Sequence, residues 1–122
     1  MSGRHLVDDS ATMLMSMEML LKRAGYTVTK SESAEAAMTA LESISPKLII
    51  TDLNMPGMNG IELIKTLKQQ SKFRFTPMLM LTTESQQSRR EEAKAAGATG
   101  WLVKPVEPEQ LLGVVKQLVP TA

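Results

Sequence analysis

Short apolar runs alternate along the chain with longer segments in which apolar residues recur every three or four positions. Short runs are typical of strands in a parallel sheet that is covered on both faces, and the longer segments are typical of the covering helices. The runs that fit a strand are His5–Val7, Tyr26–Lys30, Leu48–Thr51, Met78–Leu81 and Trp101–Val103. Five successive strand–helix units predict a doubly wound α/β fold with helices on both faces of a parallel sheet.

Residues that begin or end helices mark the longer segments. Gly25 and Gly97 can take the left-handed conformation that commonly ends a helix, and Pro108 suits a first helical turn. Ser33 is the expected N-cap of the second helix. The expected helices are about 11–24, Ser33 to Pro46, a segment that carries Ile61, Ile64 and Leu67, about 85–96, and one that begins at Pro108.

Composition supports a single domain over residues 1–122. With 122 residues, of which 43% are hydrophobic, the chain can build one sizeable core without disulfide or metal crosslinks. Lys and Arg number 14 against 13 Asp and Glu, so the net charge of +1 gives no reason to expect nucleic acid as a partner. There is no Cys, no apolar run of membrane-spanning length and no secretory leader pattern, so we expect a cytoplasmic protein without membrane insertion.

Polar side chains follow four of the five predicted strands. Asp8 and Asp9 follow the first strand, Asp52 the third, Thr82 the fourth and Lys104 the fifth. The carboxyl ends of parallel strands lie at one edge of the sheet, so these five side chains should converge there. Asp also terminates strands in ordinary turns, which is the simpler interpretation for any one of them taken alone.

Three converging carboxylates repel one another and therefore predict a bound cation. Hard oxygen ligands without His or Cys favour Mg²⁺, with Mn²⁺ as a substitute. A carboxylate beside Mg²⁺ and a Lys can attack a phosphoryl group, because both cations neutralise the transferred oxygens. The predicted product is an aspartyl phosphate.

Four motifs give the chain a resemblance to bacterial response-regulator receiver domains, closest to the single-domain chemotaxis CheY type. They are Val7-Asp8-Asp9-Ser10, Asp52-Leu53-Asn54-Met55-Pro56 followed by Gly60, Leu81-Thr82-Thr83-Glu84, and Gly97-Ala98 followed by Lys104-Pro105. The resemblance extends over nearly the whole chain and implies the strand order 2-1-3-4-5.

The resemblance also implies roles for the residues at the sheet edge. Asp52 would accept the phosphoryl group, Asp9 would ligate Mg²⁺ directly, and Asp8 would help mainly through water. Asn54 would offer its backbone carbonyl to the metal, and Lys104 would pair with a phosphoryl oxygen.

Further roles concern the switch and the lifetime of the signal. Thr82 would donate a hydrogen bond to the phosphoryl group, and Trp101 would be the aromatic residue that responds, although a plain core or surface aromatic is the alternative interpretation. Asn54 and Glu84 would tune the attack of water, and Pro105 would follow a cis peptide bond.

The first strand departs from the family pattern. Arg4 and His5 stand where receivers usually carry apolar residues, so this strand is expected to be short. His5 is expected to be a partly exposed residue at the strand end and not a ligand.

A signalling switch is the function that the resemblance implies, with no enzymatic activity beyond the protein's own phosphorylation and dephosphorylation. A histidine kinase of the chemotaxis type would supply the phosphoryl group, and a target such as a flagellar motor switch protein would dock on the fourth helix, fifth strand and fifth helix. The protein would be a monomer or weak dimer. Two alternatives remain: a relay to a histidine phosphotransfer protein, and a small-molecule phosphatase, which would need an acid where Asn54 stands.

Overall fold

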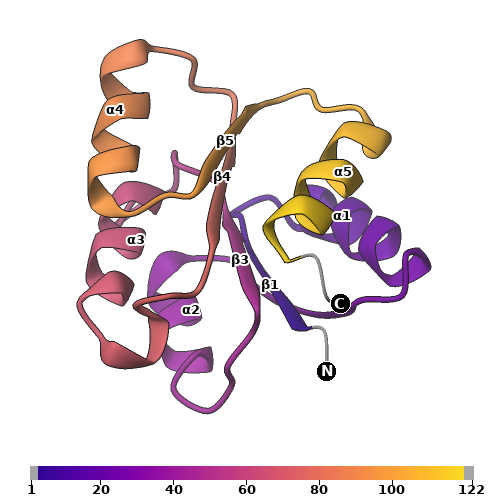
Figure 1. Ribbon diagram of the computed structural model, residues 1–122, viewed down its shortest axis with the longest axis horizontal. Helices are drawn as coiled ribbons and strands as arrows, with labels where there is room; N and C mark the ends of the chain where they lie inside the picture. The colour runs from indigo at the N-terminus through magenta and orange to yellow at the C-terminus, as the bar shows by residue number, and fades with distance from the viewer. Residues whose placement is uncertain (1–2, 120–122) are drawn as a thin grey trace.

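A computed structural model describes residues 3–119 and confirms the predicted α/β fold (Figure 1). All strand pairs in these residues are parallel, and the sheet has the order β2-β1-β3-β4-β5. The strands are β1 (Gly3–Val7), β2 (Thr27–Ser31), β3 (Leu48–Thr51), β4 (Met78–Thr82) and β5 (Gly100–Val103). The helices are α1 (Ala11–Arg23), α2 (Ala34–Ala40), α3 (Gly60–Lys68), the 3₁₀ turn η1 (Ser71–Phe73), α4 (Gln87–Ala96) and α5 (Pro108–Leu118).

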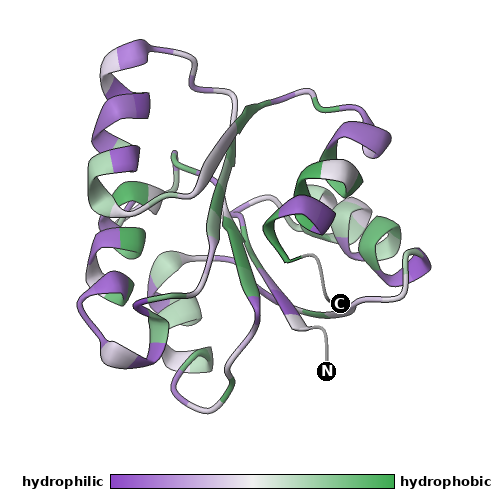
Figure 2. Cartoon of the chain, in the orientation of Figure 1, coloured by the Kyte–Doolittle hydropathy of each residue, from purple (hydrophilic) through white to green (hydrophobic). Residues whose placement is uncertain are grey.

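The helices cover both faces of the sheet, with α1 and α5 on one side and α2, α3 and α4 on the other (Figure 1). Each face has its own apolar cluster: Leu6, Leu14 and Val115 belong to the first, and Val7 and Leu63 to the second. Every residue of β3 and β4 is buried, as expected for central parallel strands. Figure 2 shows that the strands are largely hydrophobic, whereas α4 is largely hydrophilic.

Several helix ends lie at the residues that the sequence indicates. Ser33 Oγ accepts a hydrogen bond from Ala36 N at 3.0 Å, and Gly25 and Gly97 have φ angles of 98° and 121°. Helix α2 is shorter than predicted. It ends at Ala40, although the apolar residues continue to recur at helical spacing towards the predicted end at Pro46. Leu41 is still 1% exposed, so burial outlasts the helix itself.

The expectation for the first strand was wrong. Strand β1 runs over the full Gly3–Val7, and both Arg4 and His5 are completely buried. His5 Nδ1 lies 2.6 Å from Thr29 Oγ1 and its Nε2 lies 2.8 Å from Ser31 Oγ, so β2 supplies two hydroxyl partners. We call His5, Thr29 and Ser31 the hydroxyl cluster. Burial lowers the pKa of His5 to about 4, so the ring is neutral at pH 7.

Arg4 points to the other face of the sheet, where its guanidinium carbon lies 4.1 Å from the centroid of the Tyr26 ring. Stacking on an aromatic face offsets part of the cost of burying a guanidinium. Among residues 3–119, Arg4 Nε and Nη2 have no hydrogen-bond partner. Desolvation accordingly lowers the pKa of Arg4.

Candidate functional site

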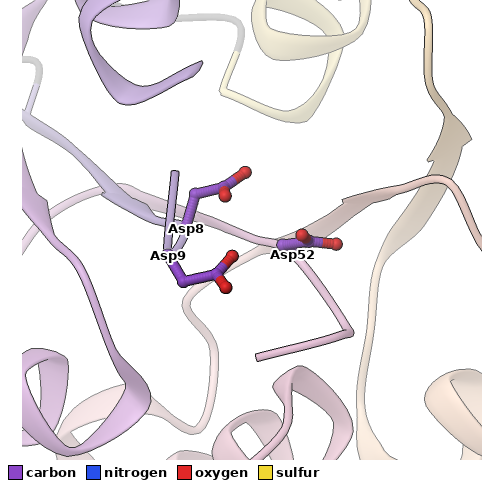
Figure 3. A group of neighbouring side chains, drawn as sticks. All are labelled: Asp8, Asp9 and Asp52. Carbon is purple, nitrogen blue, oxygen red and sulfur yellow. The ribbon is translucent and has the colours of Figure 1, made fainter. Parts of the chain in front are cut away.

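Three carboxylates meet where β1 and β3 end (Figure 3). Asp8 and Asp9 follow β1, Asp52 follows β3, and one carboxylate oxygen of each lies within 4.8 Å of the other two. The backbone supports this arrangement, since Asp52 N donates to Val7 O at 2.9 Å and Asp8 N donates to Ser31 O at 3.2 Å. We call Asp8, Asp9 and Asp52 the carboxylate cluster.

The three acids differ in exposure. Asp8 is 2% exposed, Asp52 is half-buried and Asp9 is exposed. Asp8 Oδ1 accepts a hydrogen bond from Ser10 N at 2.9 Å, and Asp52 Oδ1 accepts one from Leu53 N at 2.7 Å. Because these backbone groups hold one oxygen of each acid, the orientation of both carboxylates is set by the loops that follow β1 and β3.

Lys104 joins the carboxylate cluster from the end of β5. Its Nζ lies 2.8 Å from Asp8 Oδ2 and 3.5 Å from Asp52 Oδ2. Its backbone N–H donates to Thr82 O at 2.8 Å, and the Lys104–Pro105 peptide bond is cis, as the resemblance implies. The sheet edge therefore collects the acids and the ammonium that the sequence places after three different strands.

Thr82 and Glu84 lie on the next part of this edge. Thr82 is fully buried, and its Oγ1 accepts a hydrogen bond from Glu84 N at 3.2 Å. Glu84 is half-buried and its carboxylate accepts from Gln86 N at 3.2 Å, while Asn54 is exposed in the loop after β3. The Thr82 hydroxyl is thus engaged within its own turn.

Trp101 is half-buried on β5 and packs against the apolar cluster under α2, α3 and α4. In the sheet register Trp101 is paired with Met80, and Val103 with Thr82. Side chains alternate along a strand, so Trp101 and Thr82 face the same side of the sheet. A groove of about 280 Å³ lies beside Trp101, with Arg90 and Lys94 of α4 in its lining.

Two supporting residues received no role from the sequence. A Cβ on Gly60 would lie 2.1 Å from the backbone oxygen of Asp52, so only glycine fits where the loop returns to α3. The motif contained Gly60, but not this reason for it. Glu35 of α2 accepts a hydrogen bond from Met58 N at 3.0 Å, which holds the pKa of its carboxyl below the usual range. This contact spans 23 positions of the sequence, and no local pattern signals it.

The donor set fits a hard divalent cation. Among residues 3–119, the ion pairs of the three carboxylates come from the ammonium of Lys104, so the described side chains leave the carboxylate cluster with an excess of negative charge. All three acids offer oxygen, the ligand that Mg²⁺ and Mn²⁺ prefer. Repulsion among them is relieved by a cation, which makes this edge suited to bind one.

Comparisons with known proteins agree with this architecture. The chain matches the response regulator receiver domain family over residues 5–116. It is 38% identical over 108 residues to the chemotaxis protein CheY1 of Helicobacter pylori, which covers 87% of each chain. It is also 36% identical to the transcriptional regulatory protein FixJ of Bradyrhizobium diazoefficiens, but spans only 55% of that protein.

A solved structure of the chemotaxis protein CheY4 of Vibrio cholerae superposes with a TM-score of 0.94 at 40% identity, over 98% of this chain and 99% of that one. Within residues 3–119, no helix combines the length and the apolar character that crossing a bilayer requires.

Proposed function

Because the chain belongs to the response regulator receiver domain family, we propose that it is a phosphorylation-dependent switch of a two-component system that is modified at Asp52. A histidine kinase would donate the phosphoryl group, and the modified protein would change its affinity for a partner. The observation that carries this proposal is the carboxylate cluster with Lys104 placed between Asp8 and Asp52.

In the proposed transfer, a bond forms between a carboxylate oxygen of Asp52 and phosphorus. The bond from phosphorus to a histidine nitrogen of the kinase breaks, and its electron pair returns to the imidazole. Leu53 N holds Asp52 Oδ1, which leaves Oδ2 on the side of Lys104. Lys104 can exchange a carboxylate for a phosphoryl oxygen with little movement, because its Nζ is already 3.5 Å from Asp52 Oδ2.

Mg²⁺, or Mn²⁺ in its place, would be held by Asp9 and Asp52, by Asp8 largely through water, and by the backbone carbonyl of Asn54, and would neutralise phosphoryl oxygens during transfer. Asn54 and Glu84 flank the same edge and would set how readily water reaches the acyl phosphate. These activities concern the protein's own modification, so we assign it a signalling function and no substrate turnover.

The response would pass from Thr82 to Trp101. Thr82 Oγ1 now accepts a hydrogen bond from Glu84 N, and a phosphoryl oxygen would offer the Thr82 O–H a charged and therefore strong acceptor. Movement of Thr82 would alter the packing around Trp101, since both residues face the same side of the sheet.

The target would dock on α4, β5 and α5, where the groove beside Trp101 carries Arg90 and Lys94. We propose a chemotaxis-type kinase as donor and a flagellar motor switch protein as the kind of target, in the cytoplasm, on the basis of the CheY relatives. No membrane insertion and no nucleic acid are part of this proposal, and the protein would act as a monomer or weak dimer.

Phosphorylation with acetyl phosphate and Mg²⁺, followed by intact-protein mass spectrometry, tests the proposal. We expect the mass gain of one phosphoryl group, its absence in Asp52→Asn, and its loss when EDTA removes the metal. Glu107→Gln is the matched control, because Glu107 makes no side-chain cap contact. An unchanged mass gain in Asp52→Asn would show that the phosphoacceptor is another residue.

A second experiment separates a switch from a relay. The phosphorylated protein is mixed with a histidine phosphotransfer protein, and loss of its phosphoryl group is compared with spontaneous hydrolysis. A switch should retain the group and bind its target more tightly when phosphorylated, whereas rapid transfer to the second protein would support the relay.

A further inference from the structure

The most exposed large hydrophobic side chain of residues 3–119 is Phe75, at 88% exposure. It lies between η1 and β4, at the amino end of the central strands, and therefore at the opposite end of the sheet from the carboxylate cluster. Contact with water is unfavourable for so much aromatic surface, and exposed apolar groups of this size often mark an interaction site.

The backbone that carries Phe75 is held from several directions. Lys68 Nζ donates to Arg74 O at 3.2 Å and to Thr76 O at 2.6 Å, so it bridges the residues on either side of Phe75. Thr76 N donates to Phe73 O at 3.1 Å, and Phe73 is itself 2% exposed in the core. The aromatic ring is therefore displayed by an anchored turn.

A shallow groove of about 500 Å³ begins at Phe75. Its lining is apolar at Pro46, Pro77 and Leu118, and its ionisable groups are Lys47 and Lys72. Lys72 is fixed in place, because its Nζ donates to Leu41 O at 2.7 Å and lies 5.2 Å from the centroid of the Phe73 ring. No acidic residue belongs to the lining of this groove within the part of the chain that the structure describes.

The ionisable side chains that line the groove have one sign, since both are lysines, Lys47 and Lys72. Lys65 and Lys68 belong to a separate groove, which also contains Glu92. The chain as a whole is close to neutral at +1, so this concentration of positive charge is local. An apolar groove with positive rims complements a segment that carries both carboxylates and an apolar side chain.

We propose that the groove beside Phe75 docks an acidic peptide segment of a partner protein, with an apolar side chain of that segment against Phe75 and its carboxylates against Lys47 and Lys72. The site would work independently of phosphorylation, because it lies at the far end of the sheet from Asp52. It would tether a partner and raise the effective concentration for a second contact elsewhere on the protein. This inference goes beyond the proposed function and does not depend on it.

Fluorescence anisotropy with a labelled probe peptide tests the docking. The probe carries one Phe flanked by glutamates on both sides, and its two controls replace the Phe by Ser or the glutamates by lysines. We expect saturable binding of the probe alone, weakened by added salt. Equal binding of the lysine peptide, or no saturation at millimolar concentrations, would overturn the proposal.

Variants locate the contact. Phe75→Ser should weaken the probe about tenfold, as truncation of a central aromatic anchor does, and Lys47→Glu should weaken it severalfold. Met19→Ser is the matched control, because Met19 is another exposed apolar residue, at 53% exposure, on α1. Equal loss in the Met19→Ser variant would indicate nonspecific apolar adhesion and contradict the assignment.

Two further measurements separate the docking site from the phosphoacceptor and from a membrane contact. Binding of the probe should be unchanged in Asp52→Asn and after treatment with acetyl phosphate and Mg²⁺, so the docking site and the phosphoacceptor can fail separately. Vesicles that contain phosphatidylglycerol provide the competing surface. Tighter sedimentation with these vesicles than binding to the peptide, lost in Phe75→Ser, would replace the proposed peptide site by a membrane contact.

Discussion

The hydroxyl cluster includes a residue of β1, and the carboxylate cluster begins directly after this strand. The two clusters differ in burial, charge and hydrogen bonding. In the hydroxyl cluster, His5 is fully buried, neutral, and hydrogen-bonded on both ring nitrogens by Thr29 and Ser31. In the carboxylate cluster, which begins just after the same strand, the acids face each other and have one ammonium nearby. The first group has its hydrogen-bonding capacity met, whereas the second keeps an excess of negative charge open to solvent.

The difference separates a structural polar group from a functional one. His5 is paired and uncharged, because an unpaired charge inside a protein is costly. Repelling charges at a strand end are retained at the expense of stability where a ligand will relieve them. Perturbing each cluster should therefore move stability in different directions, which the following experiments measure.

Acid should weaken the fold through the hydroxyl cluster. The pKa of His5 is about 6.5 in the unfolded chain, whereas burial lowers this pKa to about 4 in the folded protein. Between these values the unfolded state binds more protons, so the free energy of unfolding falls as pH falls, by about 3 kcal/mol for this group. Urea denaturation of the wild type and of His5→Gln over this range should give a steeper decline in the wild type. Parallel pH profiles would contradict the burial of a neutral ring.

Divalent metal should stabilise the fold through the carboxylate cluster. At a Mg²⁺ concentration of about 100 times Kd, binding to the folded state alone adds about 2.7 kcal/mol. The measurement is the Mg²⁺-dependent rise in the urea midpoint, which should disappear with EDTA and shrink in Asp52→Asn. An equal rise in Asp52→Asn and wild type would place the metal elsewhere.

A side chain at Gly60, next to the backbone of Asp52, should both lower the stability of the fold and disturb the carboxylate cluster. In Gly60→Ala the new methyl would meet the Asp52 backbone oxygen, so the loop must shift, at a cost of about 1 to 3 kcal/mol. Gly113→Ala is the control, since a Cβ there meets nothing within 4 Å. Gly60→Ala alone should unfold at a lower urea concentration and be phosphorylated less by acetyl phosphate. Wild-type values for both would show that the loop has room that the structure does not indicate.

Removing one repelling charge should stabilise the metal-free protein slightly. Asp9 is the exposed member of the carboxylate cluster, and Asp9→Asn should raise the free energy of unfolding by about 0.5 to 1 kcal/mol in EDTA. With saturating Mg²⁺ the order should reverse, because the variant has lost a ligand. A loss of stability in both conditions would mean that the Asp9 charge is already compensated.

The same contrast explains which features could be predicted from sequence. Asp8, Asp52 and Lys104 can be assigned to one edge because each directly follows an apolar run, and parallel strands bring their carboxyl ends together. The burial and hydrogen bonding of His5 depend on the sheet register, which places it beside Thr29, 24 positions away in the sequence. A local pattern cannot contain that partner, so exposure was the wrong prediction for His5.

The apolar period similarly misled the prediction for α2. Leu41 continues the period of the helix and is buried, and its N–H still donates to Ala37 O at 2.8 Å. The next two backbone bonds, from Glu42 N to Thr39 O and from Ser43 N to Ala40 O, span only three positions, so the α-helix does not continue. The contact from Glu35 to Met58 joins α2 to the loop before α3, and it follows from how these segments pack rather than from either sequence alone. The roles assigned to Thr82 and Trp101 remain predictions.

The pairing of α1 with α5 has a consequence for the protein during its synthesis. Leu111 and Val115 of α5 share an apolar cluster with Leu6 and Leu14, so the first and last elements complete the same core. Until the last helix leaves the ribosome, one face of the nascent sheet has only part of its cover. During synthesis the chain therefore exposes apolar surface on which chaperones can bind. A premature stop codon ahead of α5 would leave that apolar surface exposed in the finished chain.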